Sequence, residues 1–121
     1  MAKTVIIGSV PKPFRYAYQA AEMLDDRGYD FVPVGIQEGE VLGRTILNAY
    51  ESPDIEEVDT VTLYVNPARQ KSIYDFILGL KPRRIIFNPG TENDELREMA
   101  RNQKIETVEA CTLVMLSVGN Y

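Results

Sequence analysis

The sequence predicts an α/β fold in which helices cover both faces of a five-stranded parallel sheet. Two observations lead to this prediction. Short runs of β-branched and apolar residues alternate with stretches of helical spacing along the chain, and glycine, proline or asparagine stands at most of the junctions. Because parallel strands need crossover connections, the intervening helices pack on both sides of the sheet. The expected architecture is therefore a Rossmann-like three-layer αβα arrangement.

The first part of the chain reads as a strand, a helix and a second strand. Residues 4–7 form a β-branched run that ends at a glycine, as is typical of a strand buried on both faces. Residues 14–27 have helical spacing after two prolines, and Gly28 ends them. Residues 31–34 predict a second strand, in which Pro33 is poorly suited to a central position because it lacks an N–H donor.

The middle of the chain has the weakest pattern. Residues 36–58 predict a loop with short helical pieces, one of them at residues 52–57. Residues 60–65 alternate β-branched and apolar side chains and predict a third strand. Asn66 and the proline after it predict a helix cap and first helical residue, so a helix over residues 67–79 follows.

The last part of the chain completes the alternation. Residues 84–87 predict the fourth strand. Thr91 is the expected cap of a helix over residues 92–102, which has acidic residues in its first turn. Residues 105–108 predict a fifth strand and residues 112–118 a short final helix.

Length and composition limit the classes of function. With 121 residues and 45% hydrophobic content, the chain is expected to form one domain over residues 1–121. It contains no histidine and one cysteine, which excludes an internal disulfide framework and any Ser-His, Cys-His or His-metal site. The net charge of −5 argues against binding to nucleic acid or to anionic membranes. The apolar run near the start is too short for a signal peptide or a membrane span, so a cytoplasmic protein is expected.

The loop after the first strand is the main candidate for a ligand site. It runs from Gly8 to Tyr16 and leads into a helix N-terminus, where free backbone N–H groups favour a phosphate. Ser9 and Arg15 add side-chain donors, and residues 1–21 contain no acid. Only the first glycine of the dinucleotide-binding pattern is present, so an ordinary βα turn is the alternative interpretation.

Other candidate residues follow the second and third strands, whose carboxyl ends meet the first loop at one edge of the sheet. Gly35 and Ile36 stand where an NAD site would have an acid for the ribose, which argues against NAD. Tyr64 and Asn66 end the third strand and are placed to contact a base or a thin ligand arm. A buried Tyr64 with a structural role is the alternative.

Two later positions at this edge also allow two interpretations. Pro89 and Gly90 let the backbone approach a ligand, or form only a tight turn. Cys111 lies near the rim of the predicted site, where helix amides would lower the pKa of its thiol, or it is a small buried apolar residue.

Over nearly its full length the chain resembles the small, single-domain CoA-binding proteins, whose Rossmann-like domain is similar to the CoA-binding domain of the succinyl-CoA synthetase alpha subunit. The resemblance rests on Gly8-Ser9-x-Pro11-x-Pro13-x-Arg15-Tyr16, Gly28-Tyr29-x-Phe31-x-Pro33-Val34, Val58-Asp59, Gly90 with Asn93, and Cys111. The chain departs from the family at Gly35-Ile36, where Asn-Pro is common, and at Asn66, where a basic residue is frequent.

The resemblance implies a site for CoA or an acyl-CoA. The loop from Gly8 to Tyr16 would hold the diphosphate, Gly35 and Ile36 would border the adenosine, and the remaining groove would be lined by residues from two later loops. The implied contact residues are Gly8, Ser9, Val10, Lys12, Phe14, Arg15, Tyr16, Gly35, Ile36, Tyr64, Asn66, Pro89 and Gly90. The phosphohistidine chemistry of the synthetase does not carry over, because the chain has no histidine.

Three hypotheses of function follow. The first is a module that binds CoA or an acyl-CoA, a small nucleotide ligand, without catalysis, catalytic residues or a metal of its own. The second is a nucleotide-dependent enzyme of small molecules that uses Cys111 as a nucleophile or NAD(P) as its ligand. The third is a regulatory protein that forms a homodimer through an apolar helix face.

Overall fold

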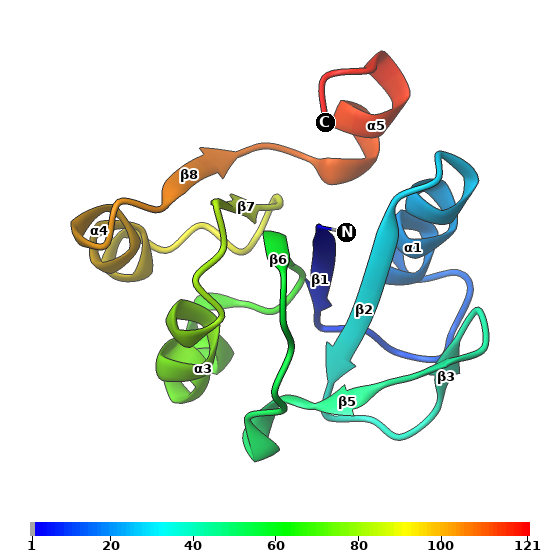
Figure 1. The fold of residues 1–121 in the computed structure, drawn as a ribbon, viewed down its shortest axis with the longest axis horizontal. Coiled ribbons are helices and arrows are strands. Elements are labelled where there is room, and N and C mark those ends of the chain that lie inside the picture. The colour runs from blue at the N-terminus through cyan, green and yellow to red at the C-terminus, as the bar shows by residue number, and fades with distance from the viewer. Residues whose placement is uncertain (1) are drawn as a thin grey trace.

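The structure is a computed structural model that describes residues 2–121 and shows a six-stranded, entirely parallel sheet between two layers of helices (Figure 1). The strand order is β5-β2-β1-β6-β7-β8. The predicted α/β class with a parallel sheet is confirmed, with one strand more than expected. The strands are β1 (Lys3–Ile7), β2 (Asp30–Gly35), β5 (Leu47–Asn48), β6 (Val58–Leu63), β7 (Arg84–Phe87) and β8 (Glu106–Glu109).

The helices form one layer on each face of the sheet (Figure 1). Helices α1 and α5 pack against each other and cover one face, while α3 and α4 cover the other. No helix within residues 2–121 combines the length and apolar character that crossing a bilayer requires. The helices are α1 (Tyr16–Asp26), α2 (Pro67–Gln70), α3 (Tyr74–Gly79), α4 (Asp94–Asn102) and α5 (Thr112–Val118), with 3₁₀ turns η1 (Ala49–Glu51) and η2 (Lys71–Ile73).

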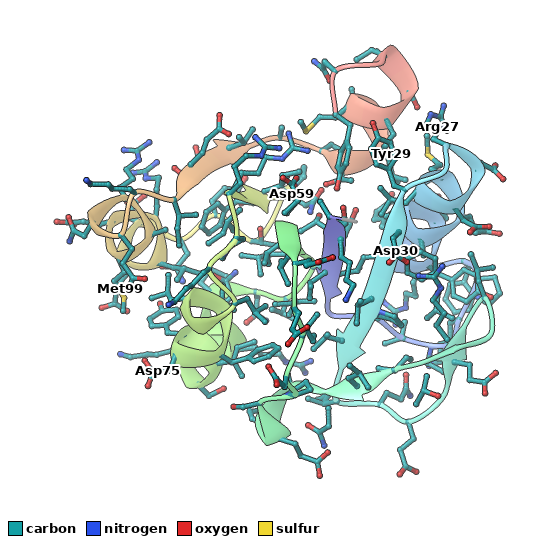
Figure 2. The ribbon with its side chains drawn as sticks, in the orientation of Figure 1. Arg27, Tyr29, Asp30, Asp59, Asp75 and Met99 are labelled. Atoms are coloured by element: carbon teal, nitrogen blue, oxygen red, sulfur yellow. The ribbon has the colours of Figure 1, made fainter. Side chains whose placement is uncertain are left out.

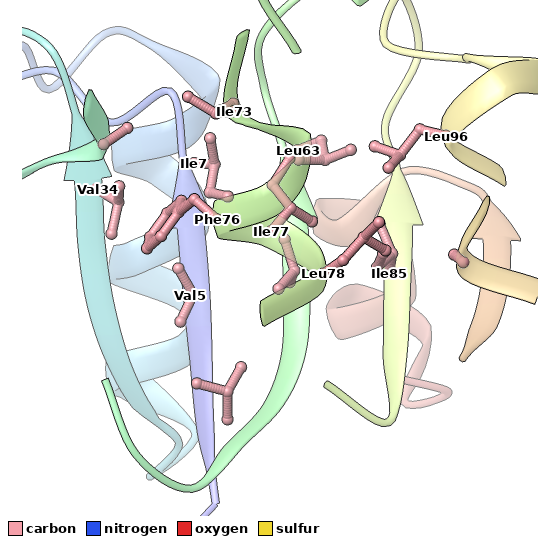
Figure 3. Close-up of a cluster of buried hydrophobic side chains, with 14 of the residues drawn as sticks. Val5, Ile7, Val34, Leu63, Ile73, Phe76, Ile77, Leu78, Ile85 and Leu96 are labelled. Atoms are coloured by element: carbon pink, nitrogen blue, oxygen red, sulfur yellow. The ribbon is translucent and has the colours of Figure 1, made fainter. Parts of the chain in front are cut away.

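Each face of the sheet has its own apolar core. The larger core lies under α3 and α4, where sheet residues pack against α3 side chains (Figure 3). Residues of this core include Val5, Ile7, Val34, Leu63, Ile73, Phe76, Ile77, Leu78, Ile85 and Leu96. The smaller core lies on the opposite face, where Ile6 and Phe31 meet Ala21 and Leu24 of α1 and Leu116 of α5. Because helices cover the sheet on both faces, the residues of its central strands β1, β6 and β7 are almost all buried, as the sequence predicts for the first strand.

The strand order creates a switch point between β1 and β6. From β1 the chain moves outward through β2 to β5, then returns to the other side of β1 as β6 and continues outward to β8. The connections that leave β1 and β6 therefore pass to opposite faces of the sheet, as the positions of α1 and α3 show (Figure 1). In open α/β sheets, a crevice forms at this point outside the carboxyl ends of the strands.

The stretch over residues 36–58 differs from its prediction as a loop with helical pieces. It contains the antiparallel hairpin of β3 (Glu40–Val41) and β4 (Arg44–Thr45), then the edge strand β5, and its helical turn is η1 rather than residues 52–57. Asn48 caps η1 by accepting a hydrogen bond from the N–H of Tyr50 at 2.9 Å. Elements of two or three residues are too short to show a period, so the sequence pattern could not reveal them.

Pro33 is compatible with its place in β2 because no second strand pairs with β2 at that residue. The strand on the outer side of β2 pairs only with its last two residues. β1 pairs with β2 along its length, whereas β5 pairs only with Val34 and Gly35. The missing N–H of Pro33 therefore leaves no ladder bond unmade on the β5 side.

The remaining boundaries differ from their predictions in small ways. Helix α1 begins at Tyr16, two residues later than expected, and the helix expected over residues 67–79 is divided into α2, η2 and α3. The predicted cap Thr91 is wrong, because the side chain of Asn93 accepts the hydrogen bond from the N–H of Leu96. Strand β8 begins and ends one residue later than the predicted fifth strand.

A buried polar network attaches α5 to the middle of the sheet. The amide nitrogen of Asn88, just after β7, donates to the Thr62 hydroxyl at 2.6 Å and to the Leu63 carbonyl at 2.9 Å. Its amide oxygen accepts from the backbone N–H of Thr112 at 2.8 Å, and the hydroxyls of Thr112 and Thr62 are 2.8 Å apart. One side chain, 2% exposed, thus joins β6, β7 and the first residue of α5.

The amino ends of the strands carry acidic side chains that are paired. Asp59, labelled in Figure 2, accepts hydrogen bonds from Nε and Nη2 of Arg83 at 2.8 and 3.0 Å. These bonds hold the pKa of the Asp59 carboxyl below its usual value. Because Asp59 is the second residue of β6, this pair lies at the end of the sheet away from the switch crevice.

We predict that Asn88→Ala lowers the free energy of unfolding by about 2 to 4 kcal/mol, because it leaves buried donors and an acceptor unpaired. Urea unfolding followed by circular dichroism would measure the change. Asn102→Ala, at the exposed end of α4, is the matched control and is expected to change stability by less than about 0.5 kcal/mol. Equal stabilities of the two variants would contradict the role given to Asn88.

Candidate functional site

A cavity of about 370 Å³ lies at the carboxyl ends of β1, β2 and β6, at the switch point of the sheet. Its walls come from the first loop and the start of α1, from the end of β2, and from the segments that follow β5 and β6. The lining residues are Ile7, Gly8, Ser9, Val10, Arg15, Tyr16, Ala17, Gly35, Ile36, Ala49, Tyr50, Tyr64, Val65, Asn66, Arg69 and Ile73.

The first loop is held tightly against the end of β2. The backbone N–H groups of Gly8 and Ser9 both donate to the carbonyl of Val34, at 2.9 and 3.0 Å. Gly8 has a φ of +102°, and a Cβ there would come within 3.0 Å of the Tyr64 backbone. A Cβ on Gly35 would overlap the carbonyl oxygen of Ser9. The glycines thus allow three backbone segments to meet at the base of the cavity.

This arrangement changes which donors of the loop can serve a ligand. The hydroxyl of Ser9 donates to the carbonyl of Ile6 at 2.9 Å, and Ser9 is only 2% exposed. Its hydroxyl and its N–H are therefore both used within the protein, as is the N–H of Gly8. Ser9 shapes the loop, and the donors left for a ligand lie further along the chain.

Those donors are at the start of α1. The first backbone N–H groups of an α-helix have no partner within the helix. Here the capping position is Arg15, which makes no side-chain cap, and the first turn contains no acid. Tyr16 and Ala17 of this turn line the cavity. The amides and the positive end of the helix dipole are therefore presented to whatever occupies it.

The charge of the cavity is positive although the chain is acidic. Arg15 and Arg69 are the charged side chains in the lining, which includes no Asp or Glu among the described residues. Neither guanidinium forms an ion pair within residues 2–121; that of Arg15 lies 5.7 Å from the ring centre of Phe14. Two unpaired cations and a free helix N-terminus favour an anionic ligand.

Asn66 has a structural task as well as a place in the lining. Its side-chain oxygen accepts a hydrogen bond from the N–H of Arg69 at 3.0 Å and so caps α2. Only its amide nitrogen is left to donate to a ligand. The cap predicted from Asn66 and the proline after it is confirmed.

Tyr64 lines the cavity, but its hydroxyl is buried and makes no hydrogen bond within residues 2–121. The side chain packs in the core between α1 and α5, near Thr62 and Thr112, whose hydroxyls bond to each other. Burial raises the pKa of Tyr64 to about 12. The group therefore stays neutral at physiological pH and is a poor proton acceptor there.

Nine of the thirteen predicted contact residues lie together in the lining, and four lie outside it. The four are Lys12, Phe14, Pro89 and Gly90. Gly90 donates its N–H to the side chain of Glu92 at 2.8 Å, and Cys111 also lies outside the lining.

Sequence reasoning missed the wall formed by Ala49, Tyr50, Arg69 and Ile73. The first two follow β5, a strand that was not expected. Arg69 had a readable signal, since it lies in the first turn of a helix that begins at the carboxyl end of a strand. That position directs a side chain toward the ligand edge of the sheet.

Comparison with known proteins identifies the family to which this chain belongs. The family described as "CoA binding domain" matches residues 2–117. The chain belongs to the CoA binding domain family. Membership confirms the resemblance stated from the sequence and supports binding of a CoA-type ligand in general. No match to a curated protein was found.

Solved structures of similar proteins agree on the fold. A crystal structure of a protein described only as uncharacterized is 59% identical, with a TM-score of 0.95, and the match covers 100% of this chain and 98% of that one. Prb, a protein redesigned for binding, is 24% identical with a TM-score of 0.83, covering 98% and 82% of the two chains. A protein from Thermus thermophilus is 23% identical with a TM-score of 0.82, covering 99% and 91%.

We predict that Gly35→Ala destabilises the protein by about 2 kcal/mol or more, because the new Cβ must displace the first loop. Gly79→Ala is the matched control, since nothing lies within 4 Å of a Cβ there, and it should change stability by less than about 1 kcal/mol. Urea unfolding of both variants measures the difference. If Gly35→Ala were as stable as the control, the close approach of loop and strand would be disproved.

The buried hydroxyl of Tyr64 predicts a pH effect. Because its native pKa of about 12 lies above the ordinary value of 10, the stability linked to it is full below pH 10 and is lost as the pH rises toward 12. Two pKa units correspond to about 2 to 3 kcal/mol. Tyr64→Phe should therefore be at least as stable as the parent protein near pH 8, because the hydroxyl it removes is buried without a partner, and should lose less stability between pH 10 and 12, measured by urea unfolding at each pH. Parallel pH profiles would contradict this.

Proposed function

We propose that this protein binds CoA or an acyl-CoA with the diphosphate at the start of α1, and that it acts as a binding module without catalysis of its own. One observation carries the proposal. The N-terminus of α1 has no side-chain cap, and with Arg15 beside it faces a cavity at the switch point of the sheet whose lining among residues 2–121 contains no acid. In an acidic chain, this local arrangement favours a polyanionic group.

The diphosphate is the part of CoA that fits this wall. Free N–H groups from the first turn of α1 would donate to phosphate oxygens, and the guanidinium of Arg15 would add a charge-assisted hydrogen bond. The first loop would contribute shape rather than donors, because Gly8 and Ser9 already use their N–H groups.

The rest of the lining suits the apolar parts of such a ligand. Tyr16, Ile36 and Tyr50 expose between 57% and 70% of their surface beside the cavity, although large apolar side chains are normally buried. A purine base or the chain of a pantetheine arm would cover these surfaces. Hydrogen-bond donors for phosphate beside apolar surfaces suit a molecule that has both a phosphate group and apolar parts.

Two observations favour CoA over NAD and binding over catalysis. Ile36 lies where an NAD site has its ribose-binding acid, and Glu38 is outside the lining. The lining among the described residues holds no Asp, Glu or Cys to serve as base or nucleophile, and the pKa of about 12 keeps Tyr64 protonated at neutral pH.

Isothermal titration of the purified protein with CoA, acetyl-CoA, NAD, NADP and AMP tests the proposal. We expect CoA and acetyl-CoA to bind with higher affinity than the other three, because they combine a diphosphate with an amphipathic arm. Native mass spectrometry of freshly purified protein would reveal a co-purified nucleotide. Heat from NAD alone would refute the proposal.

Arg15→Gln should weaken CoA binding about 10- to 100-fold, which corresponds to the loss of one charge-assisted hydrogen bond. Lys12→Gln is the matched control, because Lys12 belongs to the same loop but lies outside the cavity lining. We expect its affinity to change by less than about threefold. Thermal unfolding of both variants checks that the fold is kept. An unchanged affinity in Arg15→Gln would remove Arg15 from the site.

A further inference from the structure

We infer that Arg69 is a second determinant of ligand specificity. It acts together with Arg15, on the opposite wall of the cavity, so that the site selects a diphosphate over a monophosphate. The inference rests on the proposed function. It states that the side chain of Arg69, on the wall opposite Arg15, determines which phosphate ligands bind most tightly. Three observations carry it: the position of Arg69, the anchoring of its backbone, and its lack of a protein partner.

Arg15 and Arg69 approach the cavity from opposite layers of the protein. Arg15 precedes α1, which covers one face of the sheet, whereas Arg69 belongs to α2, whose chain continues into α3 on the other face. Both side chains line the same cavity at the carboxyl ends of the adjacent strands β1 and β6. A ligand in the switch crevice would therefore lie between two guanidinium groups.

The backbone that carries Arg69 is fixed at both ends of α2. Asn66 caps its start. At its other end Gln70 is fully buried, and its amide nitrogen donates to the carbonyls of Val65 and Thr91, each at 2.8 Å. The amide oxygen of Gln70 accepts from the side chain of Asn93 at 2.9 Å. This network ties α2 to the residues that follow β6 and to the segment before α4, so it sets the position from which the Arg69 side chain extends.

Within residues 2–121 the guanidinium of Arg69 has no hydrogen-bond or ion-pair partner, whereas most of the arginines do. Five others bond to carboxylates or hydroxyls, and one of these five also lies 4.5 Å from the ring centre of Tyr121. Those five are Arg44, Arg83, Arg84, Arg97 and Arg101. Of the remaining three within residues 2–121, Arg27 ends α1 away from the cavity, and Arg15 and Arg69 both line it.

An anchored backbone with a free cationic head group suits the binding of a second negative charge. A diphosphate has two adjacent phosphoryl groups, and each can accept paired hydrogen bonds from one planar guanidinium. A monophosphate engages one of the two arginines and leaves the other without a partner. The same arrangement therefore favours ADP over AMP, which share their base and ribose.

Isothermal titration with CoA, ADP and AMP tests the inference on Arg69→Gln, with Lys71→Gln as the matched control. Lys71 is exposed on the next turn and lies outside the lining. We expect Arg69→Gln to weaken CoA and ADP about 10- to 100-fold and AMP by less than about threefold, so that the preference for ADP over AMP is largely lost. Lys71→Gln should leave unchanged the affinities for CoA, ADP and AMP and the preference for ADP over AMP. Thermal unfolding verifies that each variant folds.

The outcomes separate this inference from the proposed function. If the parent protein binds CoA, and Arg69→Gln binds CoA and ADP with the same affinities as the parent protein does, the role of Arg69 is refuted and the proposed function stands. If Arg69→Gln weakens AMP as much as ADP, Arg69 does not distinguish the second phosphate, which also refutes the inference. If the parent protein does not bind CoA, the proposed function itself fails.

Discussion

The carbonyl of Val34, which accepts hydrogen bonds from both Gly8 and Ser9, is the constraint on which the site depends. It holds the first loop against the end of β2 so closely that Gly35 has no room for a side chain. The chain is then directed over the strand ends, and the start of α1 faces the crevice beside β6. The geometry of this crevice is thus set by backbone bonding, and under the proposed function such a preformed site lowers the entropy cost of binding the ligand.

The distribution of charge complements this geometry. Acidic residues outnumber basic ones in the chain, yet the cavity lining includes arginines and no carboxylates among the described residues. Acids at the other end of the sheet are paired instead, as Asp59 is with Arg83. Two cations in a crevice with apolar walls raise the local concentration of anions more than the same charges would on an open surface.

The sequence predicted the features that depend on repeating patterns or on a strand end. The β-branched and apolar runs predicted five of the six strands of the sheet, and the position of the first loop predicted Arg15 as a residue of the site. It could not predict β5, because a two-residue strand has no period, nor the wall that β5 brings to the cavity. It predicted Ser9 as a donor to the ligand, whereas the fold uses that hydroxyl on Ile6. Such competition between internal and external partners depends on tertiary geometry, which local patterns do not contain.

The two outer strands of the sheet also limit how the molecule can associate with others. At one side β5 offers only the two residues Leu47 and Asn48, and at the other β8 begins and ends with glutamate. Short or charged borders give another chain little length on which to add a strand. Growth of the sheet from one copy to the next, the usual first step toward fibrils, is therefore disfavoured by its own outermost elements.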